Sequence, residues 1–188
     1  MATALGLKVH AYTLHPRPTP ESRRDSSWTP EGLGDPLGVF PSKWFSGASK
    51  ADLHKFLSSG LDLLVIATPL TDNTQHLISA PEFEVLASVK KGKTYVSNIA
   101  RGPVIQTDDL IAAVEGGLIR GAALDVTDPE PLPDGHKLFS TKNVIVTPHI
   151  SGASTAYNTR VLAILDYNLT RLSEGLELTN KVSRKDGY

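Results

Sequence analysis

Three side chains in this sequence could together move a proton and hold an acid: Arg101, Glu130 and His149. A histidine can exchange a proton near neutral pH, and a carboxylate hydrogen-bonded to its ring would favour the protonated form. The planar guanidinium of an arginine can bind a carboxylate through two parallel hydrogen bonds. This combination would suit the reduction of a 2-oxo acid, with Arg101 holding the carboxylate and His149 exchanging a proton with the oxo oxygen.

The elements around these residues are expected to place all three at one edge of a sheet. Four apolar runs have the length of strands: 61–67, 93–98, 119–126 and 144–147. Helical spacing of apolar residues predicts four helices: 49–58, 80–89, 107–115 and 154–174. This alternation predicts an α/β fold, a mostly parallel sheet with helices on both faces and right-handed crossovers. Ligands bind outside the carboxyl ends of the strands in such sheets, and the three side chains each follow a different strand.

Several local features of the expected elements can be read from residue types. The apolar run 61–67 is typical of a strand that is covered on both faces. Thr107 is expected to cap the helix 107–115. Residues 7–12 predict a further strand, and the prolines after it predict a long irregular segment over 13–45. A short strand near 39–45 is an alternative for the end of this segment.

The composition bounds the class of protein. A chain of 188 residues can form one domain with a proper core. Its 19 basic and 20 acidic residues provide no bulk attraction to nucleic acid or to a membrane surface. No apolar stretch approaches the roughly 20 residues needed to cross a bilayer. The absence of cysteine rules out disulfides and thiolate ligands, and the histidines lack metal-ligand spacing, so we expect a soluble cytoplasmic protein without a metal site.

Three motifs, taken together, resemble the D-isomer-specific 2-hydroxyacid dehydrogenase family. They are Ser-Asn-Ile-Ala-Arg-Gly-Pro-Val at 97–104, the block from Ala-Leu-Asp-Val to Pro-Glu-Pro-Leu-Pro at 123–133, and Thr-Pro-His-Ile-Ser-Gly at 147–152. The resemblance covers nearly the whole chain, as the Rossmann-like cofactor domain of that family. It implies an NAD(P)-dependent oxidoreductase that transfers a hydride between a nicotinamide cofactor and a 2-oxo or 2-hydroxy acid.

The resemblance also implies roles for individual residues. Arg101 would bind the substrate, His149 would be the general acid/base and Glu130 would be the partner of the histidine. Asp125 would hydrogen-bond the carboxamide side of the nicotinamide. The other residues expected to line the cofactor are Thr68, Pro69, Ile99, Ala100 and Gly152.

The choice of cofactor depends on the residues after the strand 7–12. Members of the family that prefer NAD usually carry an acid there, whereas this chain has neutral Thr13 followed by Arg17. An arginine would bind the 2′-phosphate of NADP, so we predict NADP over NAD, with Arg17 as the phosphate contact. The alternative is that the arginines in this segment only solvate a long loop.

The chain departs from the family pattern in two parts. It contains no Gly-x-Gly-x-x-Gly turn and no counterpart of the substrate-binding domain. We therefore expect residues 1–188 to be an N-terminally truncated dinucleotide-binding domain that lacks the first strand. The missing strand would leave an unpaired apolar edge, at which another chain could pair, for example in a homodimer. The alternative to an active enzyme is an inactive relative that acts as a cofactor-binding or dimerisation module.

Overall fold

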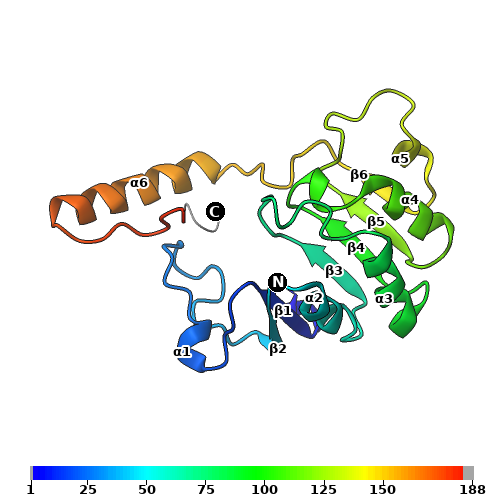
Figure 1. Cartoon of the computed structure of the whole chain (residues 1–188). Helices are drawn as coiled ribbons and strands as arrows, with labels where there is room; N and C mark the ends of the chain where they lie inside the picture. Colours follow the sequence, from blue (N-terminus) through cyan, green and yellow to red (C-terminus); the bar gives the residue numbers. More distant parts are fainter. Residues whose placement is uncertain (1, 184–188) are drawn as a thin grey trace. The chain divides into compact units, whose positions relative to one another are not determined.

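The structure, a computed structural model, describes residues 2–183, and the chain divides into two compact units. Within the described residues, the first unit contains 2–56 and 153–183, and the second contains Leu57–Gly152. Figure 1 labels the helices and strands of both. None of the described helices has the length and apolar character that crossing a membrane requires.

The second unit is built on a parallel sheet with the strand order β3-β4-β5-β6. Its strands are β3 (Leu63–Ile66), β4 (Tyr95–Asn98), β5 (Gly121–Leu124) and β6 (Val144–Val146). Its helices are α3 (Ala80–Lys90), the 3-10 turn η2 (Gly102–Val104), α4 (Thr107–Glu115) and α5 (Lys137–Ser140). The last residues of the four strands are paired in register: Ile66, Asn98, Leu124 and Val146. The predicted parallel sheet is confirmed, and α5 is an element that the sequence did not predict.

The helices of the second unit cover one face of this sheet. The helices α3 and α4 pack against each other beside the sheet (Figure 1), and Leu64 and Ile66 are buried. The alternate residues of the same strand, Leu63 and Val65, are 47% and 50% exposed. Leu63 and Val65 thus lie on the face that α3 and α4 do not cover. Successive right-handed crossovers in one direction place α3 and α4 on the same face.

The start of α4 also differs from the prediction, because Gln106 rather than Thr107 caps it. The side-chain oxygen of Gln106 accepts the N–H of Asp109 at 2.8 Å. The hydroxyl of Thr107 instead donates to the carbonyl of Asp128 at 2.9 Å. Thr107 thus connects α4 to the loop that follows β5.

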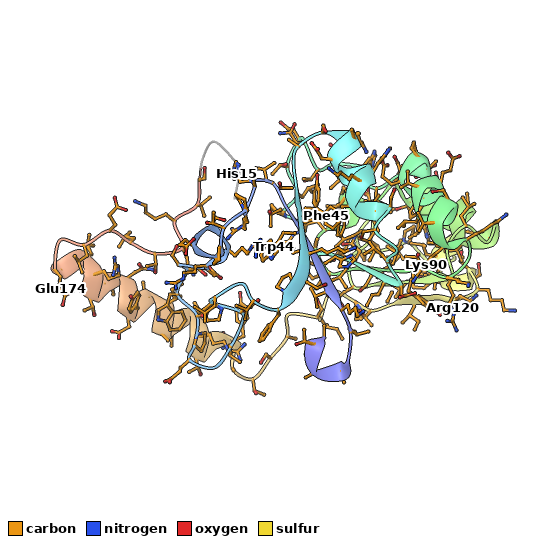
Figure 2. The ribbon with its side chains drawn as sticks, turned by 90° about the horizontal axis from the view of Figure 1, so that it is seen from below. His15, Trp44, Phe45, Lys90, Arg120 and Glu174 are labelled. Atoms are coloured by element: carbon orange, nitrogen blue, oxygen red, sulfur yellow. The ribbon has the colours of Figure 1, made fainter. Side chains whose placement is uncertain are left out.

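The amino ends of the strands carry a different set of charged residues. Figure 2 shows Lys90 and Arg120 at this end of the second unit. Lys90 forms an ion pair with Asp62, and the guanidinium of Arg120 lies over the ring of Tyr95, 5.4 Å from its centroid. These contacts lie at the opposite end of the strands from Arg101 and His149.

The first unit contains a second, two-stranded parallel sheet. Its elements are η1 (Thr3–Leu5), β1 (Val9–Thr13), α1 (Pro20–Arg23), β2 (Pro41–Ser46), most of α2 (Lys50–Leu57) and α6 (Tyr157–Ser173). The predicted strand near 7–12 is confirmed with shifted bounds. The segment 13–45 is not wholly irregular, because it contains α1 and the start of β2. A proline is tolerated in the first helical turn, and the side chain of Thr19 caps α1 by accepting the N–H of Ser22.

Packing in the first unit is carried by aromatic rings. Phe56 of α2 lies 5.3 Å from the ring of Tyr12 and 5.5 Å from that of Phe45, between centroids. Trp44 and Phe45 are neighbours on β2 (Figure 2). The helix α6 has no buried residue, and Leu162, Leu165 and Leu169 of its apolar face are exposed.

Candidate active site

His149 and Glu130 meet at the carboxyl edge of the second sheet. The ring Nδ1 of His149 lies 2.7 Å from Oε1 of Glu130. The two side chains are 48% and 37% exposed, so an incoming molecule can reach them. With Nδ1 donating to the carboxylate, Nε2 is the ring nitrogen left to exchange a proton with a substrate.

The backbone of His149 has an unusual conformation that its neighbours maintain. Its φ of 54° lies in the left-handed region, which is uncommon for residues other than glycine. Its N–H donates to the carbonyl of Asp125 at 2.8 Å and to that of Thr147 at 3.0 Å. Residues in such conformations cluster at functional sites and persist only when surrounding contacts fix them.

The buried carboxylate of Asp125 holds the residues on both sides of His149. Its Oδ1 accepts the hydroxyl of Thr147 at 2.6 Å and the N–H of Ile150 at 2.9 Å, and its Oδ2 accepts the N–H of Ser151 at 2.8 Å. Burial raises the pKa of Asp125, but the hydrogen bonds from Ser151, Thr147 and Ile150 together outweigh burial, so the net pKa lies well below its ordinary value. The charged carboxylate thus clamps the loop 147–151 that carries the histidine.

Arg101 lies in the loop after β4, and the side chain of Asn98 holds this loop in place. The buried amide of Asn98 donates to the carbonyl of Arg101 at 2.9 Å and accepts the N–H of Ala100 at 3.0 Å. The guanidinium of Arg101 is exposed, with one donor bound to the carbonyl of Ala100 at 2.7 Å. Its other donors remain for a carboxylate. Because the ends of β4, β5 and β6 are in register, Arg101, Glu130 and His149 follow neighbouring strands at one edge.

Gly102 joins the arginine loop to the loop that carries the glutamate. A Cβ at this position would lie 1.8 Å from the carbonyl oxygen of Thr127 and 2.7 Å from the nitrogen of Asp128. Only a glycine permits this approach of two backbones. The hydroxyl of Thr127 donates to the carbonyl of Pro129 at 2.9 Å, which further fixes the chain leading to Glu130.

The residues expected to line a cofactor have mixed environments. Thr68 follows β3, and its buried hydroxyl has no hydrogen-bond partner within residues 2–183. The carbonyl of Pro69 accepts the hydroxyl of Thr74 at 2.7 Å. Ile99 is 47% exposed, Ala100 is buried and Gly152 has open space around it. An orphaned hydroxyl and an exposed apolar side chain, which follow the neighbouring strands β3 and β4, fit a ligand with both polar and apolar surface, as a nicotinamide cofactor has.

Two other predicted roles are not tested by the geometry of this edge. Arg17 belongs to the first unit, where its guanidinium donates to the carbonyl of Ser22 at 3.1 Å. The carboxylate of Asp125 already accepts three hydrogen bonds of the roughly four that its lone pairs allow. Its expected contact with a nicotinamide stays a prediction. Within the described part of the chain, no group of three or more His, Asp or Glu side chains could hold a metal ion.

A cavity of about 370 Å³ adjoins the dyad, and the sequence did not point to its apolar walls. Besides Glu130 and His149, its lining includes Leu132, Phe139 and Val146. Phe139 lies on α5, the helix that was not predicted, so nothing in the pattern associated it with the site. The positioning residues Thr147 and Asn98 stood inside the motifs, but the sequence did not show which groups they bind: Thr147 binds the carboxylate of Asp125, and Asn98 binds two backbone groups.

The close approach at Gly102 predicts a large difference between two glycines. Gly102→Ala should lower the free energy of unfolding by about 1–3 kcal/mol, because the new Cβ would collide with the backbone of Thr127. Gly152→Ala is the matched control, since open space surrounds that position, and its effect should stay within about 0.5 kcal/mol. Urea unfolding followed by circular dichroism measures both. Equal stability of the two variants would contradict the described contact.

The clamp at Asp125 predicts a pH-dependent contribution to stability. Because its pKa is lowered from 3.8, the charged carboxylate stabilises the folded state fully above that pH and loses its effect as the pH falls below it. Asp125→Asn should cost about 1–3 kcal/mol near pH 7, since an amide cannot accept the same bonds. The cost should shrink toward pH 3, measured by urea unfolding. The exposed Asp134→Asn is the control, and a cost independent of pH would argue against a charged clamp.

Comparison with known proteins agrees with this geometry. Residues 41–151 match the D-isomer specific 2-hydroxyacid dehydrogenase family, NAD binding domain. Glyoxylate reductase from Thermofilum pendens is 41% identical over 124 residues, covering 66% of this chain and 35% of that protein. Glyoxylate/hydroxypyruvate reductase A from Salmonella newport is 36% identical over 146 residues, covering 76% and 44%. The chain thus spans less than half the length of these relatives.

Solved structures give the same assignment. A D-isomer specific 2-hydroxyacid dehydrogenase from Xanthobacter autotrophicus, in complex with NADPH and MES, superposes with a TM-score of 0.72 at 31% identity, over 97% of this chain and 64% of that one. The NADPH-dependent glyoxylate/hydroxypyruvate reductase from Sinorhizobium meliloti, in complex with NADP and sulfate, gives 0.71 at 28% identity, over 99% and 51%. The fold is Rossmann-like, and the chain belongs to the D-isomer specific 2-hydroxyacid dehydrogenase family, with residues 41–151 forming part of its NAD binding domain.

Proposed function

We propose that this chain carries the acid–base and carboxylate-binding groups of an NAD(P)-dependent reductase of small 2-oxo acids. The observation that supports it most is the 2.7 Å pair of His149 Nδ1 and Glu130 Oε1 at the strand edge that also carries Arg101. Glyoxylate and hydroxypyruvate appear in the names of the relatives, and they are the substrates to test first. The geometry does not favour the alternative of an inactive module over this function, since the loops that hold the three side chains are braced throughout.

Each residue has a distinct task in the proposed reaction. A bound nicotinamide cofactor supplies the hydride for the 2-oxo carbon. Arg101 holds the substrate carboxylate with the donors that its loop leaves available, and so orients the oxo group toward His149. His149 donates the proton from Nε2 to the oxo oxygen, and Glu130 stabilises the charged ring at Nδ1. In the reverse direction, the same nitrogen accepts the hydroxyl proton.

Thr68, Pro69, Ile99, Ala100 and Gly152 are the residues that would hold the cofactor in the second unit. The buried hydroxyl of Thr68 lacks a partner among the described residues, and a polar group of the cofactor could supply one. The exposed side chain of Ile99 offers an apolar surface to a flat ring. Asp125 would add one acceptor while it keeps the clamp on the loop of His149.

Steady-state kinetics of glyoxylate reduction test the assigned roles in the whole chain. His149→Asn should lower kcat by about 100-fold or more, because the proton donor is lost while asparagine tolerates the left-handed backbone. Arg101→Lys should mainly raise KM for glyoxylate, by about tenfold, since lysine cannot form the bidentate fork. Asp134→Asn, which changes an exposed loop residue, should leave both parameters unchanged. Full activity of His149→Asn would rule out its role as the acid.

We further propose that the cofactor is NADP rather than NAD, with Arg17 as the phosphate contact. The absence of an acid at Thr13 and the positive charge of Arg17 support this preference. The relatives from Xanthobacter autotrophicus and Sinorhizobium meliloti are described with NADPH and NADP.

A fluorescence titration of the whole chain with each reduced cofactor measures the preference. NADPH should bind at least about tenfold more tightly than NADH, because the two differ only in the 2′-phosphate. The preference should disappear in Arg17→Gln. A lower Kd for NADH than for NADPH in the unaltered chain would contradict the proposal.

A further inference from the structure

A short basic segment of the first unit, residues 23–27, has no part in the candidate active site. Its sequence is Arg-Arg-Asp-Ser-Ser, and no side chain from position 20 to position 27 is buried. Two arginines that lie three and two residues before a serine form the charge pattern by which one class of protein kinases selects its substrates, because acidic groups of the kinase bind the two guanidinium groups. The serine in that position is Ser26.

Ser26 is also the more available of the two serines in this segment. The N–H of Ser27 donates to Oδ1 of Asp25 at 2.9 Å, which ties Ser27 to the carboxylate. The side chain of Ser26 is exposed and forms no hydrogen bond with any of residues 2–183. Ser26 lies outside the helices and strands, two residues after the extended cap residue of α1. Its hydroxyl can therefore enter an enzyme cleft, whereas Ser27 must first leave Asp25.

The two arginines differ in how directly a kinase can bind them. Arg24 is exposed, and its side chain has no contact within the described part of the chain. The guanidinium of Arg23 donates to the carbonyls of Arg17 at 3.0 Å and Pro18 at 3.2 Å, and its Cζ lies 5.8 Å from the ring centroid of Trp44. However, α1 is a single turn without a buried residue, so its local opening costs little. Arg24 is thus bound directly, and Arg23 after that opening.

The charges around Ser26 favour an added phosphate. Asp25 already senses a neighbouring guanidinium: hydrogen bonds from Ser27 lower the pKa of Asp25 most, burial opposes them, and the charge of Arg17 lowers the pKa further. Arg17 donates to the carbonyl of Ser22 at 3.1 Å and keeps most of its five N–H groups for other acceptors. A phosphoserine carries a charge of about −1.5 to −2 and three acceptor oxygens, so it is a stronger partner for Arg17 than the carboxylate of Asp25.

We infer that Ser26 is a phosphorylation site for a protein kinase that selects arginines before the serine, and that the resulting phosphate pairs with Arg17. The γ-phosphoryl group of ATP is transferred to Oγ of Ser26. The bond between the γ-phosphorus and its bridging oxygen breaks, a bond between phosphorus and Oγ forms, ADP leaves and the hydroxyl proton passes to the kinase. Arg23 and Arg24 are the recognition residues, and Arg17 is the partner of the product.

The modification regulates the choice of cofactor, and this consequence rests on the proposed function. A phosphate attached close to Arg17 has an effective concentration on the order of millimolar, so it competes with a free ligand for the donors of that arginine. Binding of NADPH is weakened, because its 2′-phosphate loses a partner. Binding of NADH is unchanged, because NADH carries no such phosphate.

Phosphorylation of the whole chain by the catalytic subunit of cyclic-AMP-dependent protein kinase, with ATP, tests the site. Tandem mass spectrometry should find at least about tenfold more phosphate on Ser26 than on Ser27, and Arg24→Gln should lower the initial rate about tenfold. Arg160→Gln is the matched control, since Arg160 is an exposed arginine of α6 in the same unit, and it should leave the rate unchanged. Phosphate mainly on Ser27, or equal rates for the two arginine variants, would overturn the inference.

Phosphorus NMR of the phosphorylated chain tests the pairing without a cofactor. The second pKa of the phosphate should lie below the value of about 6 that is typical of phosphoserine, because a guanidinium favours the dianion. Arg17→Gln should raise this pKa toward the typical value, and Arg160→Gln should leave it lowered. The same phosphate pKa in the unaltered chain and in Arg17→Gln would exclude Arg17 as the partner.

Cofactor titration separates a failure of this inference from a failure of the proposed function. The phosphorylated chain should bind NADPH about tenfold more weakly than the unmodified chain and should bind NADH equally well. Unchanged NADPH affinity after full modification of an active reductase that prefers NADPH would overturn the competition and leave the reductase function standing. A phosphate on Ser26 that pairs with Arg17 in a chain without reductase activity supports the inference and counts against the reductase.

Discussion

The hydrogen bonds of the Asp125 carboxylate are the constraint on which the candidate site depends. They bring the hydroxyl of Thr147 and the N–H groups of Ile150 and Ser151 to one buried charge, and the histidine between them is held in a left-handed conformation. Without these bonds, His149 would leave the left-handed region, since most residues other than glycine avoid it. The burial of a charge is unfavourable by itself, and it is stabilising here because every contact is a donor aimed at a carboxylate.

Much of the second unit could be predicted from its sequence, because the apolar strand runs and the loops after them have distinct compositions. The parallel order of β3 to β6 and the meeting of Glu130 with His149 follow from strands that end in register. The clamp at Asp125 was not predictable, since two of its three partners are backbone N–H groups. Phe139 was missed as well, because its four-residue helix is too short to produce a periodic pattern.

Burial was harder to predict than secondary structure. An apolar run such as 61–67 looks the same whether one face or both are covered, and only the direction of the crossovers decides that α3 and α4 share a face. In the first unit, the apolar stripe of α6 has the spacing of a packed helix, yet its leucines are exposed.

The contact of Gly102 with Thr127 helps to fix the distance between the loops that carry Arg101 and His149. The loop of Arg101 rests on the backbone after β5 through this glycine, and the loop of His149 rests on the same stretch through Asp125. The separation between the loops of Arg101 and His149 is therefore set by contacts to one shared strand end, through the backbone of Thr127 and through the backbone and carboxylate of Asp125. If the proposed function holds, this fixed separation would distinguish substrates by the position of the oxo group along the carbon chain.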